Sequence, residues 1–94
     1  MSDGPDDVRT DAEELYEHLA ATAELPVERG ASRVLGEAEA VADDMRHLEP
    51  SIIEARAGVV VDLLAEVDGT GDERADERVT RARRLAARLA AGAD

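Results

Sequence analysis

The sequence predicts an all-α protein, a small antiparallel bundle of four helices, from two observations. Apolar residues recur every three or four positions in four blocks, which is the spacing of one helix face. Proline or glycine separates the blocks, as is typical of short connections between helices. Because 94 residues form one domain at most, we expect a single helical domain over 1–94, frayed at 1–6 and 92–94. A three-helix bundle with a loosely attached N-terminal helix is the alternative.

The first apolar block predicts a helix that ends near Glu24. Two starts remain open: Thr10, which can form a capping box with Glu13, and Pro5, which suits the first turn of a helix. Pro26 ends this helix, because proline disfavours the α conformation in the residue before it and has no N–H to donate. The apolar stripe consists of Val8, Ala12, Leu15, Leu19 and Ala23.

The second predicted helix begins near Pro26 and carries the most regular apolar spacing in the chain. Steps of four and three residues alternate without a break, which indicates a face packed along its whole length against a neighbouring helix. This apolar seam consists of Val27, Ala31, Val34, Ala38, Val41, Met45 and Leu48.

The third predicted helix opens with Glu49, Pro50 and Ser51, where Ser51 and Glu54 form a second capping box, and continues to Val67. It has little polar surface, so we expect it to be the central helix. The run Val59–Val61 is β-branched and leaves a strand as the alternative there. Gly58 would let another backbone approach closely.

A turn over 68–72 precedes the last predicted helix, which Gly92 ends. Its seam repeats the alternation of four and three and is rich in small residues, so we expect close packing. We expect the last three helices to form the body of the bundle, with the first laid across or alongside it. The seam consists of Ala75, Val79, Ala82, Ala86 and Leu89.

The chain is strongly acidic, with 23 Asp and Glu against 11 arginines, no lysine and a net charge of −12. Such a charge keeps a protein hydrated in concentrated salt. The absence of cysteine excludes disulfides, thiolate metal sites and cysteine nucleophiles. No apolar run approaches the length of a membrane span, and the first residues are acidic rather than basic as in a signal peptide. We therefore expect a cytoplasmic protein with no membrane contact.

The bias toward Ala, Asp, Glu and Arg resembles the proteins of halophilic archaea that accumulate salt. As a whole, the sequence is similar to short, acidic, uncharacterised helical proteins encoded in haloarchaeal genomes, most clearly from Glu24 to Asp44. This resemblance covers the chain and implies no activity.

The last helix is the basic exception, because residues 78–94 hold five arginines and one acidic residue, a net charge of +4. Arg78, Arg81 and Arg88 share one face, with Arg83 and Arg84 to one side. These arginines could contact phosphate, nucleic acid or an acidic partner protein, since guanidinium groups bind oxyanions. The favoured interpretation is that they meet the acidic faces of the first two helices. We do not expect a nucleic-acid partner, because the whole chain is acidic and no aromatic is available for base stacking.

Two short acidic patterns could bind a metal. Glu13, Glu14 and Glu17 on the first helix, with Glu73 and Asp76 on the last, are similar to the magnesium-binding motifs of MazG-type all-α nucleotide pyrophosphatases, which use the metal to activate water. That family places its second motif much nearer the first. A solvated acidic face is the favoured interpretation.

The turn before the last helix offers oxygens at Asp68, Thr70 and Asp72, as a calcium loop does, but Glu73 replaces the required glycine and Val79 the bidentate glutamate. Helix capping explains these residues better. Neither His18 nor His47 has a second histidine within helical reach, so we expect no metal there.

We predict no catalytic, cofactor-binding or metal-binding residue. The expected function is that of a non-enzymatic protein-interaction or dimerisation module, whose partner is another protein or a second copy of the chain. The alternatives are a magnesium-dependent pyrophosphatase-like enzyme and nucleic-acid contact through the last helix. A further possibility is that the core of the monomer uses both seams. The candidate partner-binding residues are Val34, Val41, Met45, Arg78, Arg81 and Arg88.

Overall fold

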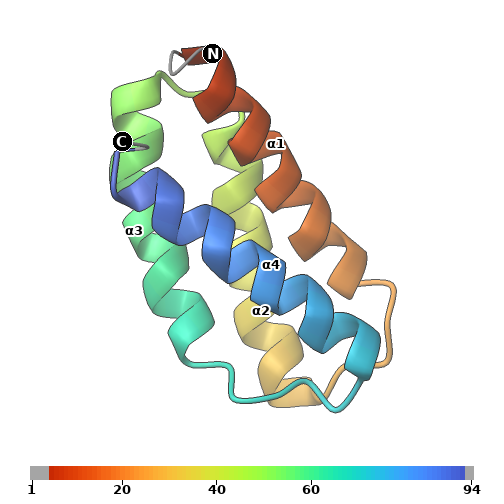
Figure 1. Ribbon diagram of the computed structural model, residues 1–94. Coiled ribbons are helices and arrows are strands. Elements are labelled where there is room, and N and C mark those ends of the chain that lie inside the picture. The colour runs from red at the N-terminus through yellow and green to blue at the C-terminus, as the bar shows by residue number, and fades with distance from the viewer. Residues whose placement is uncertain (1–4, 93–94) are drawn as a thin grey trace.

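The computed structural model describes residues 5–92, which form four helices joined by short turns (Figure 1). They are α1 (Pro5–Thr22), α2 (Arg29–Met45), α3 (Pro50–Ala65) and α4 (Glu73–Ala90). The described part of the chain contains no strand, so the predicted all-α fold of four helices is confirmed and the strand alternative at Val59–Val61 is wrong. The predicted fraying at 1–6 and 92–94 falls largely outside the described residues; of these positions, the structure describes 5–6, which belong to α1, and Gly92, which follows α4.

The helices alternate in direction and occupy the four corners of a bundle (Figure 1). α1 and α3 each pack against both α2 and α4, whereas α2 and α4 lie on opposite corners and their backbones do not approach each other closely. Ala12, Leu15 and Leu19 of α1 are fully buried, so α1 is a full member of the bundle. The alternative of a loosely attached N-terminal helix is therefore wrong.

α3 is not the central helix that its apolar composition predicts. It occupies one corner of the bundle, and Ile52 and Val59 are exposed to 45% and 40%. Apart from the adjacent residues and nearby backbone of α3 itself, no atom lies within 4 Å of the position that a Cβ at Gly58 would occupy, so the predicted close approach of another backbone is also wrong.

Both predicted seams line the core of this single chain. The alanines of these seams are small and mostly fully buried, which allows neighbouring helices to approach closely. Leucine, isoleucine, methionine and valine side chains from all four helices fill the remaining interior. The buried seam residues are Ala31, Val34, Ala38, Met45, Ala75, Val79, Ala82, Ala86 and Leu89.

The structure decides where α1 starts and corrects the predicted starts of α2 and α3. α1 begins at Pro5, which places Thr10 inside the helix. α2 begins at Arg29 rather than near Pro26, because the N–H of Glu28 donates to the carbonyl of Thr70 at 2.8 Å and holds the linker against the turn before α4. The predicted Ser51 capping box is wrong, because Glu49 is the N-cap of α3 and makes no side-chain cap.

The turn before α4 is built by helix capping. The Asp72 carboxylate accepts the N–H groups of Arg74 and Ala75 at 2.9 and 3.1 Å. Thr70 is fully buried, and its hydroxyl lies 2.8 Å from Oδ1 of Asp76, which also accepts the Thr70 N–H at 2.9 Å. These oxygens satisfy the helix start, as the capping interpretation predicts.

An arginine of α4 also caps the C-terminal end of α3. Nη2 of Arg83 donates to the carbonyl oxygen of Leu64 at 2.8 Å and to that of Val67, which satisfies carbonyl groups at the C-terminus of α3. Gly92 follows α4 with a φ of 86°, the left-handed conformation that ends helices. Within residues 5–92, no helix is long and apolar enough to cross a membrane.

Candidate functional site

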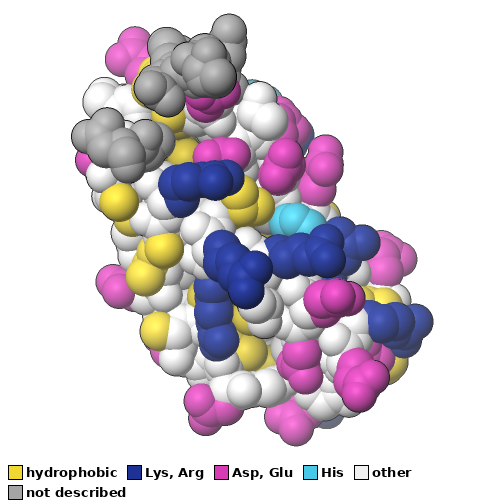
Figure 2. All heavy atoms as spheres, in the orientation of Figure 1, with side chains coloured by type: hydrophobic (Ala, Val, Ile, Leu, Met, Phe, Trp, Pro, Cys, Tyr) yellow, Lys and Arg dark blue, Asp and Glu magenta, His cyan; other side chains and the backbone are white. Residues whose placement is uncertain are grey.

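Four exposed arginines of α4, namely Arg78, Arg81, Arg84 and Arg88, form a surface that we call the arginine face. The buried seam fixes the rotation of α4, and residues three or four positions apart then share one side of the helix. Figure 2 shows dark-blue side chains gathered over α4, with a histidine beside them and acidic side chains around them. The last helix thus presents a cationic surface on a protein with a net charge of −12.

An open groove of about 320 Å³ runs along the arginine face, between α1 and α4. α4 contributes Arg81, Arg84 and Arg88, and α1 contributes Glu14 and His18. The largely buried Leu85 also lines it. The groove therefore offers three guanidinium groups, one imidazole and one carboxylate above an apolar base.

His18 is held in its neutral form in this groove. Its Nδ1 lies 3.1 Å from Nη1 of Arg78. A guanidinium group can only donate, so Nδ1 accepts and the ring proton is on Nε2. Burial, followed by the charges of Arg78 and Arg81, holds the pKa of His18 below its ordinary value, and Glu14 and Glu17 act in the opposite direction.

The arginines of the groove differ in the ion pairs that they already form within the protein. Arg88 forms a fork with Asp11 of α1, with donor–acceptor distances of 3.1 and 3.0 Å. Arg81 makes one long ion pair with Glu77, at 3.7 Å between two exposed side chains. Arg84 has no ion-pair partner among the described side chains. Arg84 and Arg81 are therefore the groups most available to an anion.

The expectation that these arginines meet acidic faces within the fold holds for one helix. Arg88 meets Asp11 of α1, whereas no ion pair among the described residues joins an arginine of α4 to α2. Sequence reasoning placed Arg78, Arg81 and Arg88 on one face and left Arg84 to one side, whereas Arg81, Arg84 and Arg88 line one groove. It also missed the contribution of His18 and Glu14, because no sequence pattern indicates which residues of α1 lie beside the arginines of α4.

The three apolar candidates belong to the core of the chain. Val34 is 8% exposed, Met45 is fully buried and Val41 is half-buried against the core. Partner binding through these residues stays a prediction, and at Val34 and Met45 it would require the bundle to open.

The acidic patterns are separated by the fold. Glu13 lies 3.5 Å from Arg46, Glu14 lines the groove, and Asp76 accepts hydrogen bonds from Thr70. Among the described residues, no three of His, Asp and Glu are placed to hold a metal ion together.

The Arg46 guanidinium also stacks on the ring of Tyr16, 4.1 Å from its centroid, so the sole aromatic of the chain is covered.

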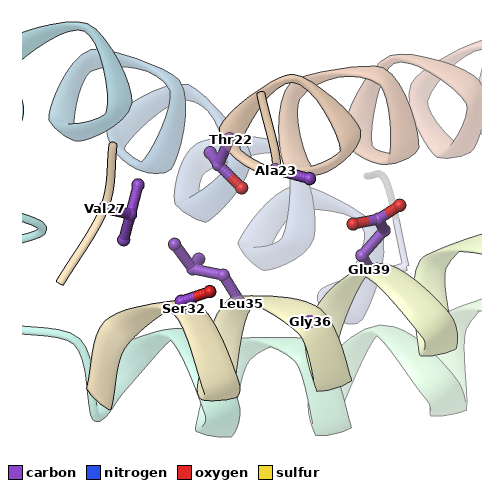
Figure 3. Close-up of a pocket in the computed structure, with 7 residues that line it drawn as sticks. All are labelled: Thr22, Ala23, Val27, Ser32, Leu35, Gly36 and Glu39. Carbon is purple, nitrogen blue, oxygen red and sulfur yellow. The ribbon is translucent and has the colours of Figure 1, made fainter. Parts of the chain in front are cut away.

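A smaller pocket of about 130 Å³ lies between the end of α1 and the start of α2 (Figure 3). The Thr22 hydroxyl is already bonded to the carbonyl of Leu19 at 2.6 Å, and Leu35 extends into the space between the two helices. Glu39 is its one charged lining residue. This pocket lacks the convergent charged donors found in the α1–α4 groove.

Residues 11–94 match the family model described as Domain of unknown function (DUF8152). No curated protein and no solved structure matches the sequence.

Proposed function

We propose that this protein, which belongs to the DUF8152 family, is a non-enzymatic interaction module that binds an acidic segment of a partner protein through the arginine face. One observation carries the proposal: exposed arginines line an open groove on a protein whose net charge is −12. Guanidinium groups bind carboxylates through two parallel hydrogen bonds, so the face is suited to acidic side chains.

The availability of Arg84 and Arg81 supports this assignment. Arg84 has no ion-pair partner among the described side chains, and the exposed Arg81–Glu77 pair at 3.7 Å contributes little to folding. Both groups can turn to a ligand without breaking a contact that the bundle needs. Arg88 is different, because its fork on Asp11 joins α4 to α1 and keeps the wall of the groove in place.

The dimensions of the face favour a short acidic segment over a long polyanion. Arg78 and Arg88 are ten residues apart, or about 15 Å along a helix. A nucleic acid would extend beyond this length over acidic surface, where repulsion acts within a Debye length of about 8 Å at physiological ionic strength. Tyr16 is covered by Arg46, so no exposed aromatic supports base stacking.

The burial of the seams supports this surface over the apolar one. Val34 and Met45 already pack inside the chain, so a partner that used them would have to replace core contacts. The arginine face can be reached without opening the bundle.

Fluorescence anisotropy with a labelled octaglutamate peptide tests the proposal at an ionic strength of ~0.15 M. We expect saturable binding, and a loss of about tenfold or more in affinity for the double variant Arg81→Gln with Arg84→Gln. Arg56→Gln is the matched control, because Arg56 is an exposed arginine on α3, away from the groove.

Three outcomes would contradict the proposal. The wild-type protein could fail to bind the peptide, or the control could lose as much affinity as the double variant. Tighter binding of an eight-nucleotide single-stranded DNA under the same conditions would assign the face to nucleic acid instead.

A further inference from the structure

The α1–α4 groove contains a titratable group that an anion would affect directly. In the structure, His18 is neutral because its Nδ1 accepts from Nη1 of Arg78 at 3.1 Å. The other ring nitrogen, Nε2, therefore carries the proton and is the remaining donor of the ring. No hydrogen-bond partner of Nε2 is present among the described residues.

The charges that face His18 come from both helices of the groove. α4 presents Arg78 and Arg81 to the ring, with Arg84 and Arg88 further along the groove, and α1 presents Glu14 and Glu17. The arginines oppose a positive charge on the imidazole and the glutamates favour it. An anion near Arg81 and Arg84 would offset the arginines and so favour protonation of His18.

We infer that the groove is a proton-linked anchor, in which one carboxylate of the acidic partner binds between Arg81 and Arg84 while His18 takes up a proton. This inference rests on the proposed function and specifies how the partner is held. The balance is simple: one proton moves from solvent to Nδ1 of His18, and no covalent bond other than N–H forms.

Protonation also changes the hydrogen bonds of the groove. With a proton on Nδ1, His18 can no longer accept from Arg78, so this guanidinium is released to a ligand. The ring itself becomes a cation with two donors. Both changes add favourable contacts for an anion, and linkage requires that the anion in turn stabilises protonated His18.

The octaglutamate titration, repeated between pH 8 and pH 5.5, tests the anchor. We expect affinity to rise several-fold as the pH falls, by at most about tenfold per pH unit for one linked proton. His18→Asn removes the titration while its side-chain oxygen can still accept from Arg78, so we expect binding without this rise. His47→Gln, which alters the other histidine of the chain, should keep it.

The failures of the two proposals can be told apart. Peptide binding with the same pH dependence in wild type and His18→Asn would overturn the anchor and leave the proposed function intact. Absence of peptide binding at every pH would overturn the proposed function.

An NMR titration of His18 with and without sodium sulfate tests the anchor without the peptide, since sulfate stays a dianion over this range. A sulfate-induced rise in the pKa of His18, absent for His47, supports the anchor. An unchanged pKa overturns it.

Discussion

The Nδ1 atom of His18 on α1 accepts a hydrogen bond from Nη1 of Arg78 on α4, at 3.1 Å. The two residues lie 60 positions apart in the sequence. The contact exists because α1 and α4 are neighbours in the bundle, and it links a titratable ring to the arginine face.

The lowered pKa of His18 predicts that folding stability depends on pH. The pKa lies below the ordinary value of 6.5, chiefly because of burial and then because of Arg78 and Arg81, so the unfolded chain binds the proton more readily. The contribution of His18 is therefore fully present above about pH 6.5 and is lost as the pH falls through the folded-state value. Urea unfolding followed by circular dichroism should show this loss in the wild type and in His47→Gln, but less of it in His18→Asn. Equal pH profiles for the wild type and His18→Asn would contradict the prediction.

The N-cap of α4 predicts that folding stability depends on the charge and the side chain of Asp72. Hydrogen bonds from Arg74 and then from the N–H of Ala75 hold the pKa of Asp72 below its ordinary value. Its stabilising effect is thus present above about pH 3.8 and is lost as the pH falls through the folded-state pKa. At pH 7, we expect Asp72→Ala to lower the melting temperature by about 4–8 °C. Asp72→Asn should lower it by less, because asparagine still caps the helix but loses the charge that pairs with Arg74. A melting temperature for Asp72→Ala equal to that of the wild type would show that the cap is dispensable.

Burial of the α2 seam predicts that its side chains stabilise the folded chain. Met45 is fully buried, so Met45→Ala should cost about 2–5 kcal/mol of unfolding free energy. Val41→Ala, at a half-buried position, should cost less. Urea unfolding measures both costs, and light scattering on a sizing column measures the oligomeric state. A change of oligomeric state in Met45→Ala without a loss of stability would instead place the seam between two copies of the chain.

Gly58, inside α3, and Gly92, just after α4, predict changes of stability of opposite sign. Gly58 lies inside α3, and an added Cβ would meet no atom within 4 Å beyond the adjacent residues and nearby backbone of α3, so Gly58→Ala should stabilise the protein by about 0.5–1 kcal/mol. Gly92 has a φ of 86°, so Gly92→Ala should cost about 1 kcal/mol through backbone strain. Thermal unfolding of the two variants checks both signs, and destabilisation by Gly58→Ala would mean that α3 packs more closely than the structure indicates.

The limits of the prediction are clearest at the helix starts and in the groove. The stripes that contain Leu15, Val34 and Val79 follow from local spacing, and all three side chains are buried as the spacing indicates. The predicted start of α2 was wrong because the N–H of Glu28 donates to the carbonyl of Thr70, which is remote in the sequence, and this bond fixes the linker between α1 and α2. Ser51 was assigned as a cap from its pattern alone, whereas the N-cap of α3 is Glu49, two residues earlier.

The amino-acid sequence by itself determined the helices, the faces they bury and the concentration of arginines on the last one. Helical periodicity and composition are local properties, so they can be read without knowing which helices touch. Only the tertiary structure decided that α1 lies beside α4, that the seams meet within one chain, and that His18 joins Arg81 and Arg84 in one groove. Those outcomes depend on how small, similar apolar faces pack against one another, and no single segment of the chain specifies that choice.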